Sequence, residues 1–151
     1  MQISYSKSIY YNVRLTSRYL KAFIMQVLEK LNAGISFDEV FALDILNCEG
    51  TLCQRDLAKL LFKDRANTGK IAQGLQDKGL ISINSEQKNN RQVKNLSLTE
   101  KGQIFLKDLK EKSKPVLDKI SERFSKEEYE TLLKSLTKIM KEIEPVLETQ
   151  I

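Results

Sequence analysis

The stretch QRDLAKLLFKDRANTGKIAQGLQDKGLI, residues 54–81, decides the fold. Its first eight residues space their apolar side chains as a short helix does, and Asp64 then stands where it can cap a second helix over residues 65–78. Gly79 is expected to end that helix, because glycine readily adopts the left-handed conformation found after helix ends. Two short helices joined by a tight turn form a helix-turn-helix unit.

Two segments with strand character follow this unit, at residues 80–83 and 93–98. They flank a polar stretch, residues 84–92, that contains no apolar run. The pattern predicts a β-hairpin with a long charged tip. A hairpin placed directly after a helix-turn-helix unit predicts a winged helix.

Long amphipathic patterns lie on both sides of this lobe. Apolar residues recur every three or four positions over residues 4–31, 99–123 and 125–144, which predicts three long helices. Pro115 is expected to bend or break the second of them, and Pro145 to end the third. A lobe this small cannot cover the apolar faces of such helices, so they are expected to pair with a second copy of the chain.

Two capping boxes mark helix starts, Ser36 with Glu39 and Ser125 with Glu128. The expected fold class is therefore mainly α with a small β-hairpin wing. In this arrangement a winged helix-turn-helix lobe at residues 36–98 is flanked by dimerisation helices at residues 1–34 and 99–151.

The excess positive charge of the chain comes from a single segment, which holds the helix-turn-helix unit and the hairpin. Residues 51–98 hold nine basic and four acidic groups, an excess of five that equals the net charge of the whole chain, +5. A local positive field of this kind suits a polyanion, because phosphate contacts supply most of the non-specific affinity for nucleic acid. A solvated basic face is the alternative interpretation.

Composition excludes several other classes of protein. There is no histidine and there are only two cysteines, so nucleophile–histidine pairs, imidazole metal sites and a disulfide framework are all excluded. No phosphate-binding glycine loop is present either, so we expect neither an enzyme nor a cofactor. No apolar run is long enough to span a membrane, and the first residues lack the apolar stretch of a signal peptide, which predicts a cytoplasmic protein.

Four motifs follow the pattern of one family in order and spacing. They are Gln54-Arg-Asp-Leu-Ala58, Asp64-Arg65, Leu75-Gln-Asp-Lys-Gly-Leu-Ile81 and Leu98-Thr-Glu-Lys-Gly102. Over nearly its whole length the chain resembles the multiple-antibiotic-resistance-regulator (MarR) family. The resemblance implies a homodimeric repressor that binds palindromic double-stranded DNA, with the N-terminal and last two helices forming the dimer interface.

The wing departs from the pattern of that family. Family wings usually carry an aspartate and an arginine with one residue between them. Here those two positions are Asn90 and Gln92, with Arg91 between them. The usual salt bridge of the wing therefore cannot form. Arg91 still offers a planar cationic fork to a phosphate or to the minor groove. The candidate wing contacts are Lys88, Asn90 and Arg91.

One face of the helix over residues 65–78 is expected to enter the major groove. Wound at 100° per residue, Thr68, Ala72 and Leu75 fall on one side of it. Lys70 is suited to donate to guanine, Asn67 and Gln73 are suited to read adenine, and Gly69 would let the backbone come close. The candidate recognition residues are Arg65, Ala66, Asn67, Gly69, Lys70 and Gln73.

The start of the preceding helix supplies candidate contacts to the DNA backbone. They are Gln54, Arg55 and Lys63. Side chains and amides at that position of a helix-turn-helix unit face the phosphates of the duplex.

Two features suggest what such a regulator would sense. Cys53 stands at a helix start, where free amides lower the pKa of a thiol, and Cys48 is near enough in sequence to act as its resolving partner. The alternative is that Cys53 is simply a small half-buried residue. The family resemblance instead implies a small aromatic or anionic ligand, bound between the DNA-binding lobe and the dimer helices.

The altered wing leaves a second function open. The chain would then be a helical, dimeric protein-interaction module whose winged helix does not bind DNA. Salt-dependent DNA binding distinguishes the two hypotheses.

Overall fold

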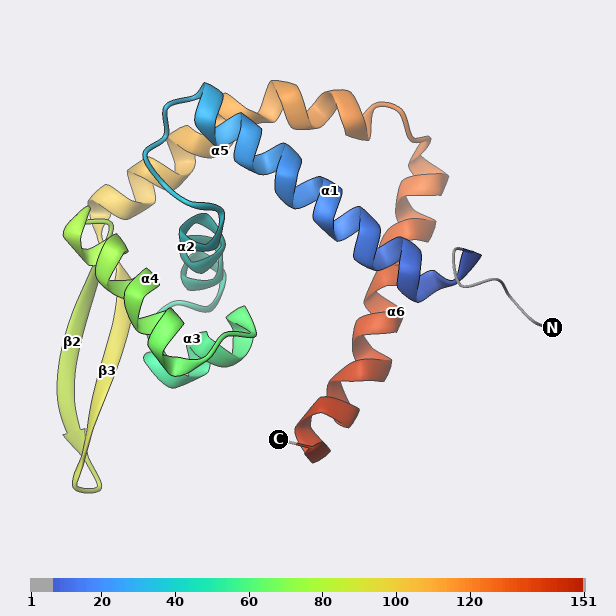
Figure 1. Cartoon of the computed structure of the whole chain (residues 1–151). Helices are drawn as coiled ribbons and strands as arrows, with labels where there is room; N and C mark the ends of the chain where they lie inside the picture. The colour runs from blue at the N-terminus through green and yellow to red at the C-terminus, as the bar shows by residue number, and fades with distance from the viewer. Residues whose placement is uncertain (1–6, 151) are drawn as a thin grey trace. The chain divides into compact units, whose positions relative to one another are not determined.

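The computed structural model describes residues 7–150, which form six helices and a three-stranded sheet (Figure 1). In chain order the elements are α1 (Ile9–Lys30), α2 (Phe37–Glu49), β1 (Leu52–Cys53), α3 (Gln54–Leu61), α4 (Arg65–Asp77), β2 (Ile81–Lys88), β3 (Arg91–Leu98), α5 (Glu100–Ser121) and α6 (Lys126–Gln150). The fold is mainly helical with a β wing after a helix-turn-helix unit, as predicted. The chain divides into two compact units, and the boundary between Lys112 and Ser113 falls within α5.

The helices of the lobe begin at the polar residues that the sequence indicated. Ser36 Oγ accepts from the amide of Glu39 at 3.2 Å, and Glu39 Oε2 accepts from the amide of Ser36 at 2.8 Å, so the capping box of α2 is complete. Asp64 Oδ1 accepts from the amide of Asn67 at 2.8 Å and caps α4. These bonds satisfy amides that would otherwise lack partners at the helix ends.

The motif after the wing joins α4 and α5 at their ends. Thr99 Oγ1 donates to the carbonyl of Gly79 at 2.7 Å and accepts from the amide of Gly102 at 3.0 Å. Gly102 is buried, and a Cβ placed on it would lie 2.0 Å from the carbonyl oxygen of Leu80. Glycine is therefore required there, because α5 begins directly against the chain that leaves α4.

The wing is longer and more regular than predicted. The sheet order is β1-β3-β2, and β2 and β3 pair without interruption from Ile81↔Leu98 to Lys88↔Arg91, which makes the paired ribbon that projects from the helices in Figure 1. The prediction of a long charged tip was therefore wrong. A two-residue turn, Asn89-Asn90, closes the hairpin with φ of +51° and +58°. Asparagine tolerates this left-handed backbone, so the strands can continue to the tip.

The core of the lobe is built from all of its elements. Leu43 of α2, Leu57 of α3, Leu75 of α4 and Leu96 of β3 are all fully buried. Leu106, in the first half of α5, closes the same cluster. Each buried leucine contributes about 1.5–3 kcal/mol of stability relative to an exposed one. Because these residues form one cluster, the lobe has a continuous core within a single chain.

Neither internal proline ends its helix. α5 runs through Pro115 and α6 runs through Pro145. The prediction that Pro145 ends the helical pattern was wrong, and Pro115 does not break its helix. A proline removes one amide donor and distorts one turn, while the hydrogen bonds on either side of it remain.

Helices α1 and α6 leave large apolar side chains exposed to solvent. On α1 the most exposed are Ile9, Tyr10, Tyr19 and Met25. On α6 the exposed apolar residues are Tyr129, Leu132, Leu133, Leu136, Met140, Ile143, Val146 and Leu147. The spacing of three and four residues places those of α6 on one stripe of the helix.

Candidate nucleic-acid interface

The two faces of α4 divide largely as its sequence predicted. Thr68, Ala72 and Leu75 are buried against the lobe, and Arg65, Ala66, Asn67, Lys70 and Gln73 are exposed. Gly69 differs from the prediction of an outward position, because it is half-buried beside the side chain of Gln54. The exposed residues lie three and four positions apart, so α4 offers one continuous polar face.

Two amides on that face already have partners within the chain. Asn67 Nδ2 donates to Asp64 Oδ2, and Gln73 Nε2 donates to Asp77 Oδ1 at 2.8 Å. The hydrogen bonds from Asn67 also hold the pKa of Asp64 below its ordinary value. Either amide must exchange its acidic partner for a base edge before it can read DNA. In the part of the chain that the structure describes, the side chains of Lys70 and Arg65 have no hydrogen bond or ion pair, so both are exposed donors ready to bind.

The candidate backbone contacts on α3 are placed differently from one another. Gln54 Nε2 donates to the carbonyl of Arg65 at 3.3 Å and so joins α3 to the first turn of α4. Lys63 Nζ lies 3.1 Å from Asp38 Oδ2, which ties the turn of the helix-turn-helix unit to α2. Arg55 is largely exposed, with only a 3.7 Å contact to Asp56. Arg55 is therefore the freest of the three to reach a phosphate.

The wing tip brings two cations together. Lys88 and Arg91 are directly opposite each other at the last pair of the ladder, next to Asn90 in the turn, and all three are exposed. Like charges at opposed positions destabilise a strand pair. The acidic Glu86 does not pair with either cation, because its Oε1 accepts a hydrogen bond from Asn95 Nδ2 at 2.6 Å. The tip therefore presents a concentrated positive charge that an anion would stabilise.

Cys53 stands at the start of α3 without capping it. Its side chain accepts no capping hydrogen bond, and its Sγ instead donates to Asp56 Oδ2 at 2.9 Å. That hydrogen bond is the main reason that the pKa of Asp56 lies below its ordinary value. Cys48 is exposed.

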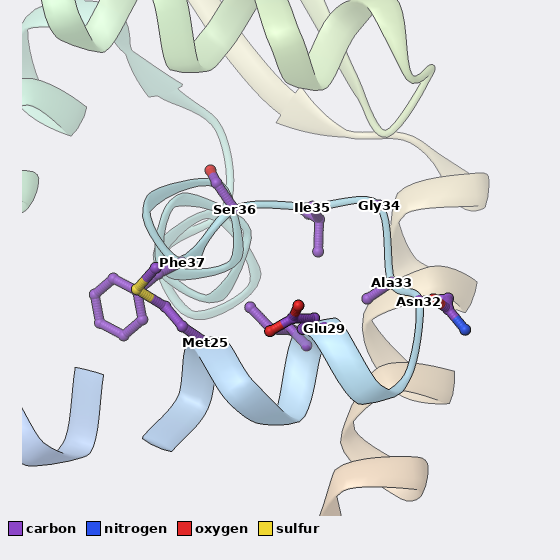
Figure 2. A pocket seen from close by; sticks show the side chains of 9 residues that line it. Met25, Glu29, Asn32, Ala33, Gly34, Ile35, Ser36 and Phe37 are labelled. Atoms are coloured by element: carbon purple, nitrogen blue, oxygen red, sulfur yellow. The ribbon is translucent and has the colours of Figure 1, made fainter. Parts of the chain in front are cut away.

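A hollow of about 440 Å³ lies between the last turns of α1 and the segment that leads into α2 (Figure 2). It is lined by Met25, Leu28, Glu29, Asn32, Ala33, Gly34, Ile35, Ser36 and Phe37. The lining is mostly apolar, and Glu29 is its charged residue. No tyrosine or arginine of α1 is among its lining residues.

Residues 7–150 contain no group of three or more cysteine, aspartate or glutamate side chains placed to hold a metal ion. Within the same residues, no helix is long and apolar enough to cross a membrane.

One interaction that the sequence did not indicate joins α2 to α4. Lys78 Nζ donates to Glu39 Oε1 at 2.6 Å across 39 positions of sequence. The capping box predicts that Glu39 lies in the first turn of a helix. It does not predict that the second carboxylate oxygen of Glu39 binds the residue at the end of α4, because that contact joins distant parts of the sequence.

Comparison with known protein families identifies the lobe. The family described as TFIIE alpha subunit matches residues 20–129. The chain belongs to this winged-helix family. None of the curated protein sequences matches the chain.

Solved structures extend the likeness beyond the winged helix to the terminal helices. The chain is similar to the MepR–DNA complex of S. aureus, with a TM-score of 0.70 and 23% identity over 93% of this chain and 99% of that one. It is also similar to wild-type MarR from E. coli, with a TM-score of 0.73 and 16% identity over 93% and 99% of the two chains. NadR in complex with 4-hydroxyphenylacetate gives a TM-score of 0.73 and 23% identity over 92% and 96%.

This winged-helix protein therefore has the fold of MarR-family regulators across most of its length, which confirms the resemblance seen in its motifs.

Proposed function

We propose that the chain is a homodimeric, cytoplasmic transcription regulator that represses its targets by binding a palindromic DNA operator. The observation that carries the proposal is the cationic surface of the lobe. Lys70 on α4 and the pair Lys88 and Arg91 at the wing tip are all exposed. An exposed recognition-helix lysine suits guanine in the major groove, and cations at a wing tip suit the minor groove or its phosphates. MepR, which has the same fold, is described in complex with DNA.

The exposed stripes of the terminal helices support the homodimer. Eight large apolar side chains on α6 alone are exposed in the single chain. Contiguous apolar surface of this extent marks an interface with another protein. A two-fold dimer presents two copies of α4, and these match two half-sites of a palindrome about one helical turn apart.

The test is a mobility shift of the purified protein against a labelled pool of fragments from its own genome, at two salt concentrations. We expect selective retention of a palindromic fragment. Binding should be weaker at the higher salt, because the release of counterions from the phosphates, which favours binding, becomes less favourable. Lys70→Ala should weaken binding of that fragment about tenfold, which corresponds to one base contact. Arg91→Ala should lower the affinity for all fragments and reduce its dependence on salt.

Lys126→Ala is the matched control, because Lys126 is an exposed lysine at the start of α6. It should leave retention unchanged. If the folded protein retains no fragment at low salt, the DNA-binding proposal is wrong and the protein-interaction module becomes the better account.

We further propose that a small aromatic ligand modulates DNA binding. The hollow beside α1 is large enough for one aromatic ring, and Met25, Leu28 and Phe37 give it apolar walls. The negative charge of Glu29 disfavours an anionic ligand in this position. NadR, which shares the fold, is described with an aromatic acid, 4-hydroxyphenylacetate.

Two probes that differ by one carboxylate test this choice. p-Cresol and 4-hydroxyphenylacetate share a phenol ring, and we expect p-cresol to raise the melting temperature more at equal concentration. Glu29→Gln should reduce the difference between the rises in melting temperature that the two compounds cause. A larger shift with 4-hydroxyphenylacetate, unaltered by Glu29→Gln, would rule out the hollow as the ligand site.

A further inference from the structure

The candidate recognition helix α4 carries two glycines, and each lies under a polar side chain from another helix. A Cβ placed on Gly74 would lie 2.7 Å from Glu39 Oε1, and one placed on Gly69 would lie 3.2 Å from Gln54 Nε2. Interior glycines weaken a helix relative to alanine. The sequence thus gives up helix stability at two positions where a side chain from another helix lies close to the backbone of α4.

Glu39 braces the C-terminal end of α4. The residue is 9% exposed, and its two carboxylate oxygens accept hydrogen bonds from two different partners. Oε2 accepts from the amide of Ser36 at 2.8 Å, and Oε1 accepts from Lys78, the residue that caps α4, at 2.6 Å. Burial alone would raise the pKa of Glu39, yet the hydrogen bonds from Lys78 and Ser36 bring it below its ordinary value. The carboxylate therefore stays charged and ties the start of α2 to the end of α4.

Gln54 braces the other end. Its amide donates to the carbonyl of Arg65 in the first turn of α4 and lies against Gly69. The two braces come from different helices, α2 and α3, and reach α4 about one turn from each of its ends. Two separated contacts of this kind fix the rotation of a helix as well as its position.

We propose that Glu39 and Gln54 are positioning residues that fix the pose of α4, and that this pose sets how well the protein distinguishes its operator from other DNA. The inference rests on the proposed function, because it assumes that α4 reads base edges. Base contacts require close alignment with the groove, whereas non-specific affinity comes from phosphate charge and is indifferent to a small rotation of one helix. Disturbing a brace should therefore weaken specific binding alone.

The brace itself can be tested without DNA by a double-mutant cycle on thermal stability at one fixed protein concentration. Gly74→Ala in the wild-type chain should lower the melting temperature, because the new Cβ displaces the Glu39 carboxylate from Lys78. In a Glu39→Ala background the same change should raise it by about 2–4 °C, since only the gain in helix propensity remains. The nearest remaining atom, Lys78 Nζ, would be 3.9 Å away, an ordinary contact.

The effect on DNA is measured as the ratio of operator affinity to the affinity for an unrelated duplex. Glu39→Ala, Gly74→Ala and Lys78→Met should each lower this ratio about tenfold, the equivalent of one misplaced base contact. Lys78→Met leaves the capping box with Ser36 in place, and so separates the brace from the cap of α2. Lys112→Met is the matched control, because it removes a lysine from a surface ion pair on α5 and should leave the ratio unchanged.

Three results would overturn the proposal. One is a fall in melting temperature from Gly74→Ala of equal size in both backgrounds. A second is an unchanged ratio in folded Glu39→Ala and Gly74→Ala proteins. A third is an equal loss of both affinities in Lys78→Met, which would make Lys78 a phosphate contact instead. A wild-type protein without any operator preference would overturn the proposed function, while the stability cycle would still decide whether the brace exists.

Discussion

The winged-helix lobe and the terminal helices use the same apolar residue types in opposite ways. In the lobe Leu57 is 0% exposed and Leu75 and Leu96 are equally buried, whereas Leu133 on α6 is 56% exposed. The lobe therefore completes its core within one chain. The terminal helices expose a continuous apolar stripe, and such a stripe is stable in water only when another surface covers it.

The largest effect is expected from a cavity in the lobe. Leu57→Ala removes a fully buried side chain from α3 and should lower the free energy of unfolding by about 2–5 kcal/mol. Leu60→Ala in the same helix is the control, because that leucine is 42% exposed and should cost much less. Urea denaturation followed by circular dichroism gives both values. Equal losses would mean that α3 is not anchored in the core as described.

A charge on the exposed stripe should act on assembly rather than on the lobe. Leu133→Lys is expected to convert the dimer into a monomer, because the interface would have to bury an unpaired ammonium group. Analytical ultracentrifugation measures the change in mass, with Lys134→Ala as the neighbouring control. Should Leu133→Lys leave the mass at that of two chains, α6 is not part of the interface.

These two regions also differ in how far the sequence predicts them. Ser36, Asp64 and Ser125 gave correct helix starts, because a cap and its amide partner lie within three residues of each other. Thr99 and Gly102 were noticed as a family motif, and the structure adds their physical role in joining α4 to α5. Contacts between residues that are close together in the sequence can therefore be predicted from the sequence.

Contacts between residues that are far apart in the sequence could not be predicted. The contact of Lys78 with Glu39 depends on how α2 and α4 pack, and the contact of Gln54 with Gly69 depends on the angle of the helix-turn-helix unit. The length of the wing was missed for a different reason. The part of β2 beyond Ile83 is polar on both faces and lacks the alternation that marks a half-buried strand.

A smaller, stabilising effect is expected in the turn of the helix-turn-helix unit. Phe62 has φ of +51° and is 80% exposed, so it carries backbone strain and little packing. Phe62→Gly should raise the free energy of unfolding by about 1 kcal/mol. Asn90→Gly at the wing tip is the control and should gain less, because asparagine tolerates that backbone better. A loss of stability in Phe62→Gly would show that the aromatic ring is packed after all.

The smallest effect concerns acid. The pKa of Glu39 is below its ordinary value of 4.5, so the unfolded chain takes up this proton at a higher pH than the folded one. The stability that Glu39 contributes is present above pH 4.5 and is lost as the pH falls below that value. Glu39→Gln should therefore flatten the fall in melting temperature in this range. If the melting temperature of Glu39→Gln falls at low pH as steeply as that of the wild type, the ion pair of Glu39 with Lys78 is absent in solution.

The central claim is that the lobe completes its core within one chain, whereas the terminal helices need a second chain to cover their apolar stripe. The most direct test is the mass of the protein–DNA complex. Sedimentation of the purified protein with its selected palindromic duplex should give one species that contains two chains per duplex, and Leu133→Lys should abolish that species while leaving the lobe folded. A single chain bound per duplex with undiminished affinity, or an unaffected complex with Leu133→Lys, would contradict the account.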